Sequence, residues 1–221
     1  MAAAAMREVI VQLIEDGSWT SRAKSLERLA TRFAEGGLDE GEWHAITDAF
    51  RVALYDGEPL VRRVLAETVK GAADLPRDVL LALARDMAAV AAPVLEHSRL
   101  LSEDDLLPVV KTGSTAHRLA ISGRRLISGR VAEALCRVGE RSVILRLVAN
   151  EGAAITEATL HWLLDHFPDQ PGVAETIGKR RLLPVSVSSR LFGVIPPMRG
   201  ESPERERPRL RVVSDRSGAW R

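Results

Sequence analysis

The sequence of 221 residues has one cysteine, an aromatic content of only 4% and a formal net charge of +1. The single cysteine, Cys136, excludes an intramolecular disulfide framework and a zinc site built from cysteines, because both need several sulfur atoms. The small net charge provides no general attraction to DNA or to an anionic membrane, so such binding would require a local basic patch. These absences favour a protein of the reducing cytoplasm.

Long apolar runs are also absent from the sequence. No segment approaches the roughly 18 to 20 consecutive apolar residues that cross a bilayer, and we expect no membrane insertion. The N-terminal stretch "MAAAAMREVIVQLIEDG" lacks the basic start of a signal peptide, and Arg7 and Glu8 interrupt its apolar run. We interpret this stretch as an amphipathic first helix.

What the chain does have is a repeat. Ala, Leu, Val and Arg dominate the composition, which favours helices and predicts an all-α fold. Five segments share one pattern, and their first residues are separated by 26, 26, 28 and 28 positions. The segments are "LPRDVLLALARDM" from Leu75, "LSEDDLLPVVKTG" from Leu101, "ISGRVAEALCRVG" from Ile127, "ITEATLHWLLDHF" from Ile155 and "LPVSVSSRLFGVI" from Leu183. Such self-similarity is typical of stacked helical units.

Each repeated segment is predicted to begin a helix. Ser102, Ser128 and Thr156 are residues that cap helix starts, and Pro76 and Pro184 suit a first helical turn. Two apolar positions recur eight and nine residues after each segment start and predict one buried stripe: Leu83, Val109, Leu135, Leu163 and Leu191, then Ala84, Val110, Cys136, Leu164 and Phe192. A second apolar segment precedes each of the later starts, so we expect two helices per repeat.

The pattern continues more loosely upstream, where Leu26, Leu29, Ala30 and Phe33 fall on one helical face. A single helix pair cannot bury its own apolar stripe, so consecutive pairs must stack. We therefore predict an α-solenoid of stacked antiparallel helix pairs, a HEAT-like superhelix, over residues 1–195. Residues 1–55 form its less regular N-terminal cap, and regular repeats occupy residues 60–195. The Arg- and Pro-rich residues 196–221 are predicted to be a disordered tail, with a docking peptide around "RLRVV" and Trp220 as the alternative.

Two stretches resemble known families. The segment "DGEPLVRRVLAETV" from Asp56 resembles the HEAT repeat. The span from about Leu60 to Leu191 resembles the bacterial family known as domain of unknown function 2336, through "LARDMAAVAAPVLEHSRLLSEDDLL", "AISGRRLISGRVAEALCRVGERSV", "ANEGAAIT" and "RRLLP". The resemblance implies a HEAT-like solenoid with a regulatory role, and it brings no catalytic residues to this chain.

The basic residues concentrate in the middle of the chain. Residues 111–150 carry eight basic and two acidic side chains, whereas residues 1–110 carry 12 basic and 19 acidic ones. A stacked solenoid would present these cations as a continuous surface for DNA, RNA or an acidic protein. The candidate binding surface consists of Arg118, Arg130, Arg137 and Arg141.

A pair of adjacent arginines is predicted to be structural instead. Arg124-Arg125 recurs two repeats later as Arg180-Arg181, and Arg99 aligns with Arg125. Cations at helix C-termini complement the helix dipole and bind open carbonyls, which explains a recurrent arginine without any ligand.

Asn150 has two interpretations. Inward asparagines hold the peptide backbone in armadillo-type solenoids, which makes Asn150 a weak candidate for a peptide contact. The neighbouring repeats have Ser122 and Gly178 at this position, however, so the asparagine ladder is missing, and a helix-ending turn suits the local sequence.

Signatures of catalysis and of metal binding are missing from the sequence. It contains no Gly-rich phosphate loop, GxSxG motif, kinase signature or HExxH motif, and His161 and His166 do not share a helical face. His117 aligns with apolar residues of the other repeats and is expected in the core. We expect no catalytic residue, no metal ligand and no cofactor.

The leading hypothesis is thus a non-enzymatic, cytoplasmic adaptor or regulator that binds an unknown protein or peptide. The alternative is a HEAT-like protein that binds nucleic acid through its basic middle repeats, with chemistry on DNA bases as an extension of that role.

Overall fold

The computed structural model describes residues 3–15, 17–167 and 171–194, and the predicted tail, residues 196–221, lies outside this range. The all-α prediction is confirmed, since the described residues form helices and no strand. The helices are α1 (Ala3–Glu15), α2 (Trp19–Glu35), α3 (Glu40–Ala53), α4 (Pro59–Val69), α5 (Arg77–Arg85), α6 (Ala88–His97), α7 (Glu103–Thr112), α8 (Thr115–Ser122), α9 (Gly129–Val138), α10 (Arg141–Ala149), α11 (Glu157–His166), α12 (Pro171–Gly178) and α13 (Val185–Val194). None of these helices is long and apolar enough to cross a membrane.

The predicted helix starts are confirmed. α5, α7, α9, α11 and α13 each begin two residues after the first residue of a repeated segment. The caps are also as predicted, because the hydroxyls of Ser102, Ser128 and Thr156 accept backbone N–H groups at 3.3, 3.4 and 3.2 Å. Caps of this kind satisfy one of the open amides at a helix start and fix where the helix begins.

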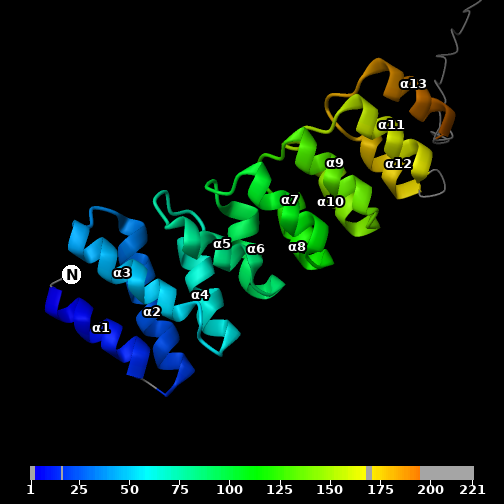
Figure 1. The fold of residues 1–221 in the computed structure, drawn as a ribbon. Coiled ribbons are helices and arrows are strands. Elements are labelled where there is room, and N and C mark those ends of the chain that lie inside the picture. Colours follow the sequence, from blue (N-terminus) through cyan, green and yellow to red (C-terminus); the bar gives the residue numbers. More distant parts are fainter. Residues whose placement is uncertain (1–2, 16, 168–170, 195–221) are drawn as a thin grey trace, which may run out of the picture.

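The helices lie in two rows along an elongated molecule (Figure 1). In one row α2, α4, α6, α8, α10 and α12 contact one another in sequence. In the other row α5, α7, α9, α11 and α13 do the same, and chain neighbours pack across the rows. At the N-terminal end, α1 packs against both α2 and α3.

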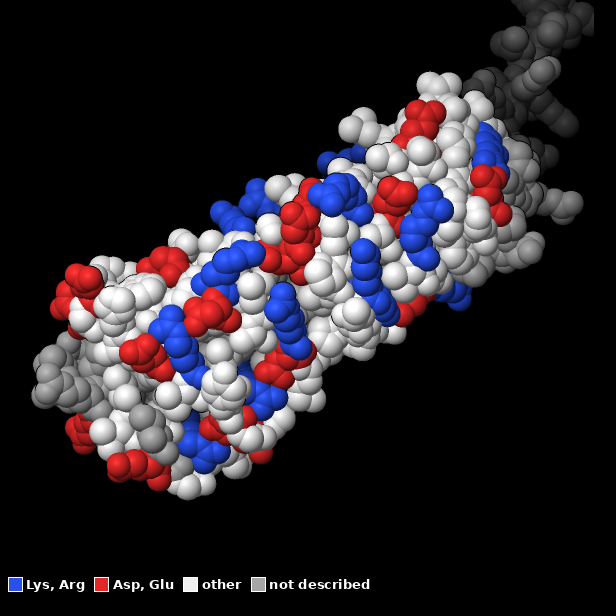
Figure 2. Space-filling model, viewed as in Figure 1, with Lys and Arg blue, Asp and Glu red and all other residues white. Residues whose placement is uncertain are grey.

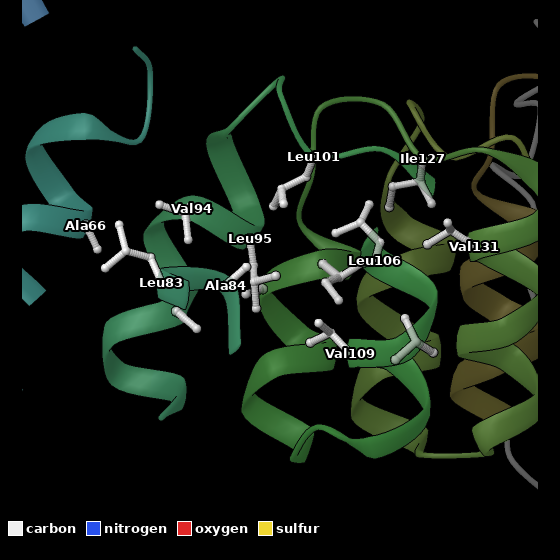
Figure 3. Close-up of a cluster of buried hydrophobic side chains, with 14 of the residues drawn as sticks. Ala66, Leu83, Ala84, Val94, Leu95, Leu101, Leu106, Val109, Ile127 and Val131 are labelled. Atoms are coloured by element: carbon white, nitrogen blue, oxygen red, sulfur yellow. The ribbon is translucent and has the colours of Figure 1, made fainter. Parts of the chain in front are cut away.

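Apolar side chains between the rows form one continuous core from Val9 to Leu191. Figure 3 shows part of it, in which Leu83, Leu95, Leu106 and Val131 follow one another from α5 to α9. The predicted stripe is buried at nine of its ten positions. The exception is Phe192, which is 85% exposed because α13 is the last helix described and no later helix covers it.

The connectors between successive repeats are joined by backbone hydrogen bonds. Ile127 N–H donates to the carbonyl of Gly152 at 3.1 Å, and Ala154 N–H donates to the carbonyl of Ile127 at 2.8 Å. Gly152 is required here because an added Cβ would lie 1.9 Å from the carbonyl oxygen of Arg125. The two connectors therefore have a fixed register.

Candidate functional site

Arg118 does not lie on an open surface, which corrects its place among the candidate binding residues. Its side chain is 11% exposed, and Nη1 donates to Oε1 of Glu140 at 2.6 Å. Its Nε donates to the carbonyl of Val110 at 2.7 Å. The guanidinium therefore joins α8 to the residue that precedes α10, and it is not available to a ligand.

Arg118 is one of three arginines at the fourth position of a helix that pair with an acid just before a later helix. Arg22 in α2 binds Asp56 with hydrogen bonds of 2.7 and 2.9 Å. Arg62 in α4 binds Asp86 at 2.6 and 2.9 Å. We call these three pairs the arginine ladder. Its members tie one helix of the first row to the start of the next.

Asp86 organises the starts of two helices. The N–H of Met87, before α6, donates to its carboxylate at 2.7 Å, and Nε2 of His117 in α8 donates to its carbonyl at 2.9 Å. His117 is thus half-buried and bonded instead of packed in the core, and its Nδ1 accepts the N–H of Ser114. Burial alone would raise the pKa of Asp86, but the hydrogen bonds from Arg62 and Met87 outweigh it and lower the pKa.

The two arginines of the recurrent pair have different roles. Arg124 donates to the carbonyls of Leu95 and Ser98 at 2.5 and 2.8 Å, at the end of α6. The equivalent Arg180 donates to the carbonyls of Val148 and Asn150 at the end of α10, and to that of Ala153 in the connector that follows, at 2.8 to 3.0 Å. Each guanidinium thus binds the open carbonyls of the preceding repeat, not those of its own helix. Burial lowers the pKa of Arg124.

Arg99, Arg125 and Arg181 do not share this structural role, which corrects the prediction made for them. All three side chains are exposed, and no side-chain hydrogen bond joins them to another described residue. Arg125 and Arg181 lie in bends directly after Arg124 and Arg180, and only the first arginine of each pair reaches the carbonyls. The leucines that follow two of them, Leu126 and Leu182, are 73% and 87% exposed.

Asn150 is occupied inside the protein, which removes it as a peptide contact. Its amide donates to the carbonyls of Ser122 and Arg124 at 3.1 and 2.7 Å. Its side-chain Oδ1 accepts the N–H of Gly152 at 2.9 Å. Asn150 closes the end of α8 in the way that Arg124 closes α6 and Arg180 closes α10.

Two of the predicted arginines, Arg130 and Arg137, line the same groove between α7 and α9. The groove has a volume of about 530 Å³. Leu107, Ala134 and Val138 supply its apolar lining, and Lys111, Arg130, Glu133 and Arg137 supply its charges. We call it the α7–α9 groove. It combines apolar contact area with a net positive rim, a combination that suits an apolar side chain flanked by carboxylates.

The charges in this groove differ in how they are paired. Arg130 lies 3.2 Å from Glu103, and Arg137 lies 3.3 Å from Glu133. Both pairs are exposed, so each arginine binds its acidic partner weakly and can exchange it for a ligand carboxylate. Lys111 has no ionic partner among the described residues. The groove thus has one unpaired cation and two that are loosely paired.

Arg137 and Cys136 also border a smaller crevice of about 70 Å³ between α9 and α11. The guanidinium of Arg137 lies 4.8 Å from the ring centroid of Trp162. The Trp162 ring also stacks on His166, with the ring centroids 4.2 Å apart, and meets Phe167 edge-on at 6.0 Å. Cys136 is fully buried, and burial raises the pKa of its thiol to about 12. The thiolate is the reactive form, so this cysteine is inert at neutral pH.

The fourth candidate, Arg141, lies apart from the groove. It is the first residue of α10, its side chain is exposed, and its guanidinium lies beside Gly172 of α12. On the face shown in Figure 2, Lys and Arg alternate with Asp and Glu along the molecule. The predicted arginines therefore do not form one basic track. Within the described ranges, no group of three His, Cys, Asp or Glu residues is arranged to hold a metal ion.

Sequence reasoning missed the arginine ladder, although the sequence contained a signal for it. The repeats were aligned on α5, α7, α9, α11 and α13, and the ladder belongs to the other row. An arginine four residues into a helix and an acid just before a later helix recur in that row at Arg22, Arg62 and Arg118. Alignment on these positions would have marked Arg118 as structural.

Comparison with known proteins identifies a family. The family model described as an uncharacterised protein conserved in bacteria, domain of unknown function 2336, matches residues 90–217. The match begins 30 residues later than the resemblance seen in the sequence and continues 26 residues further, through most of the Arg- and Pro-rich segment. No curated protein and no solved structure matches the chain.

Proposed function

Because the chain belongs to the uncharacterised bacterial family of domain of unknown function 2336, we propose from its geometry that it is a HEAT-like α-solenoid that binds a protein or peptide. In this proposal it acts in the cytoplasm as a non-enzymatic adaptor or regulator. The two rows of helices and the arginine ladder support a solenoid, because each helix pair contacts mainly its neighbours along the molecule.

The α7–α9 groove is the observation that carries the proposal. Its volume of about 530 Å³ accommodates one or two apolar side chains, and its rim carries Lys111, Arg130 and Arg137. A partner segment with an apolar anchor flanked by Asp or Glu would bury the anchor against Leu107 and Ala134. Its carboxylates would then meet cations at the rim.

Photo-crosslinking in the bacterial host tests this proposal. A photoreactive phenylalanine replaces Ala134 in the groove and, as the control, the 90% exposed Tyr55 in the connector before α4. We expect one discrete partner band from position 134 and none from position 55. Equal bands from both positions, or no band from position 134, would contradict binding in the groove.

A charge-reversed variant sharpens this test. Lys111→Glu combined with Arg130→Glu places two negative charges on the rim, and we expect the band from position 134 to fall at least tenfold. Arg28→Glu combined with Arg63→Glu makes the same charge change at two exposed arginines outside the groove, and it is expected to leave the band unchanged.

Nucleic-acid binding is the second candidate, supported by Lys111, Arg130 and Arg137 in one groove. Glu133 in the groove and Glu103 beside Arg130 weaken this candidate, because carboxylates repel phosphates. A mobility-shift titration with a 30-base-pair DNA duplex and with single-stranded RNA at 50 and 200 mM salt distinguishes the two. Tight binding that falls steeply with salt and is lost in the rim variant would favour nucleic acid.

A further inference from the structure

The last helix, α13, has an apolar face that no described residue covers. Phe192 and Val185 are seven residues apart, so they lie on one side of the helix, and they are 85% and 83% exposed. Leu182, in the connector before α13, is 87% exposed. Large apolar side chains exposed together at one end of the molecule favour a surface that contacts something else.

The repeat register shows that this face belongs to a core. Phe192 occupies the position held by Ala84, Val110, Cys136 and Leu164 in the other repeats, and those four side chains are at most 5% exposed. In each earlier repeat the next helix of the same row contacts the helix that carries this position. Residues 195–221 directly follow α13 and are one source of a covering element.

Residues 195–221 are well placed to supply it. They begin directly after α13, and the 16 residues from 195 to 210 span up to roughly 50 Å when extended, whereas a ten-residue helix is about 15 Å long. The segment "RLRVV", from Arg209, alternates arginine with Leu210 and Val212. In an extended conformation these two apolar side chains share one side.

The family match supports the same segment and discriminates within it. The matched region continues past α13 to residue 217 and so includes residues 209–213, whereas Trp220 falls outside the match. We propose that residues 209–213 dock on the exposed face of α13, with Leu210 and Val212 against Phe192 and Val185. The final pair of helices is then capped by the chain itself, as terminal repeats of solenoids require.

Hydrogen exchange on the full chain tests the docking. Leu210→Asp combined with Val212→Asp makes the docking segment polar, and we expect the amides of α13 to exchange at least tenfold faster than in the unmodified protein. The amides of α9 serve as the internal reference and keep their rates. Ser202→Asp combined with Ser214→Asp adds the same charge to the same segment, and it is expected to change neither helix.

Faster exchange in α9 would reveal that the first variant has lost its fold. A reciprocal variant, altered in α13, tests the docking in that case. Phe192→Asp removes the receiving side chain, and we expect trypsin to cleave after Arg209 and Arg211 at least tenfold faster. If α13 exchange and tryptic cleavage are both unchanged by these variants, the docking is wrong. If α13 protection rises with protein concentration between 5 and 200 µM, a second copy covers the face and the proposal is also overturned.

Discussion

Adjacent arginines in this protein have different environments, and Arg124 and Arg125 show this most clearly. The first donates to two carbonyls at the end of α6, and the second is exposed. Both residues have the same charge and the same chemistry, so the difference comes from their positions in the connector. Arg180 and Arg181 repeat the arrangement two repeats later.

This difference can be measured as stability. Arg124→Ala leaves the carbonyls of Leu95 and Ser98 without their donor, and we expect a loss of about 2 kcal/mol in the free energy of unfolding. Arg125→Ala is the matched control and is expected to stay within about 0.5 kcal/mol. Urea denaturation followed by circular dichroism measures both. Equal losses would show that the position in the pair does not matter.

The sequence predicted that an arginine has a structural role better than it predicted which group that arginine binds. Repetition identified Arg124 as structural, but the carbonyls that it binds belong to the preceding repeat, which a local pattern does not reveal. Arg118 had no repeat equivalent in the alignment used, and its ionic partner, Glu140, is 22 residues away. Long-range pairing depends on which helices become neighbours, so it requires the fold.

At the scale of helices, the predicted starts agree with the structure because capping is local. Ser102, Ser128 and Thr156 each accept a backbone N–H from the residue three positions ahead, so a short stretch of sequence is enough to predict the cap. The other row has fewer such caps, and the arginine ladder joins its members instead. Rows held by different interactions should respond differently to pH.

Arg62→Ala tests the ladder. The variant leaves the carboxylate of Asp86, whose side chain is 15% exposed, without its cation, and we expect a loss of about 2 kcal/mol at pH 7. The lowered pKa of Asp86 stabilises the folded state above the ordinary pKa of about 3.9, and this contribution is lost as pH falls through the lowered value.

The stability difference between the Arg62→Ala variant and the unmodified protein should therefore shrink as the pH falls below about 4. Arg63→Ala removes an exposed neighbour, and it is expected to stay within about 0.5 kcal/mol at every pH. Urea midpoints measured from pH 7 to pH 2.5 test both expectations. A difference that remains constant over this range would mean that Asp86 is not the group responsible.

At the scale of the whole molecule, the two rows predict local instead of global responses to damage. Gly152→Ala forces a Cβ to within 1.9 Å of the Arg125 carbonyl oxygen, so the connectors before α9 and α11 must separate. In a solenoid each pair depends mainly on its neighbours. We expect faster hydrogen exchange in α8 to α11 and unchanged exchange in α2 and α4.

The control for this prediction is Gly71→Ala, whose added Cβ has no atom within 4 Å and which is expected to change no exchange rate. Uniformly faster exchange along the whole chain in the Gly152→Ala variant would indicate one cooperative unit, and it would argue against the proposed solenoid.

The arginine ladder also has a fixed order of synthesis. Arg22, Arg62 and Arg118 precede their acids in the chain by 34, 24 and 22 residues. During synthesis each arginine therefore leaves the ribosome, already carried by a helix, before the carboxylate that it will bind. α4, α6 and α10 thus each meet an arginine already present on the preceding helix of that row, so these parts of the molecule can assemble from the N-terminus as the chain is translated.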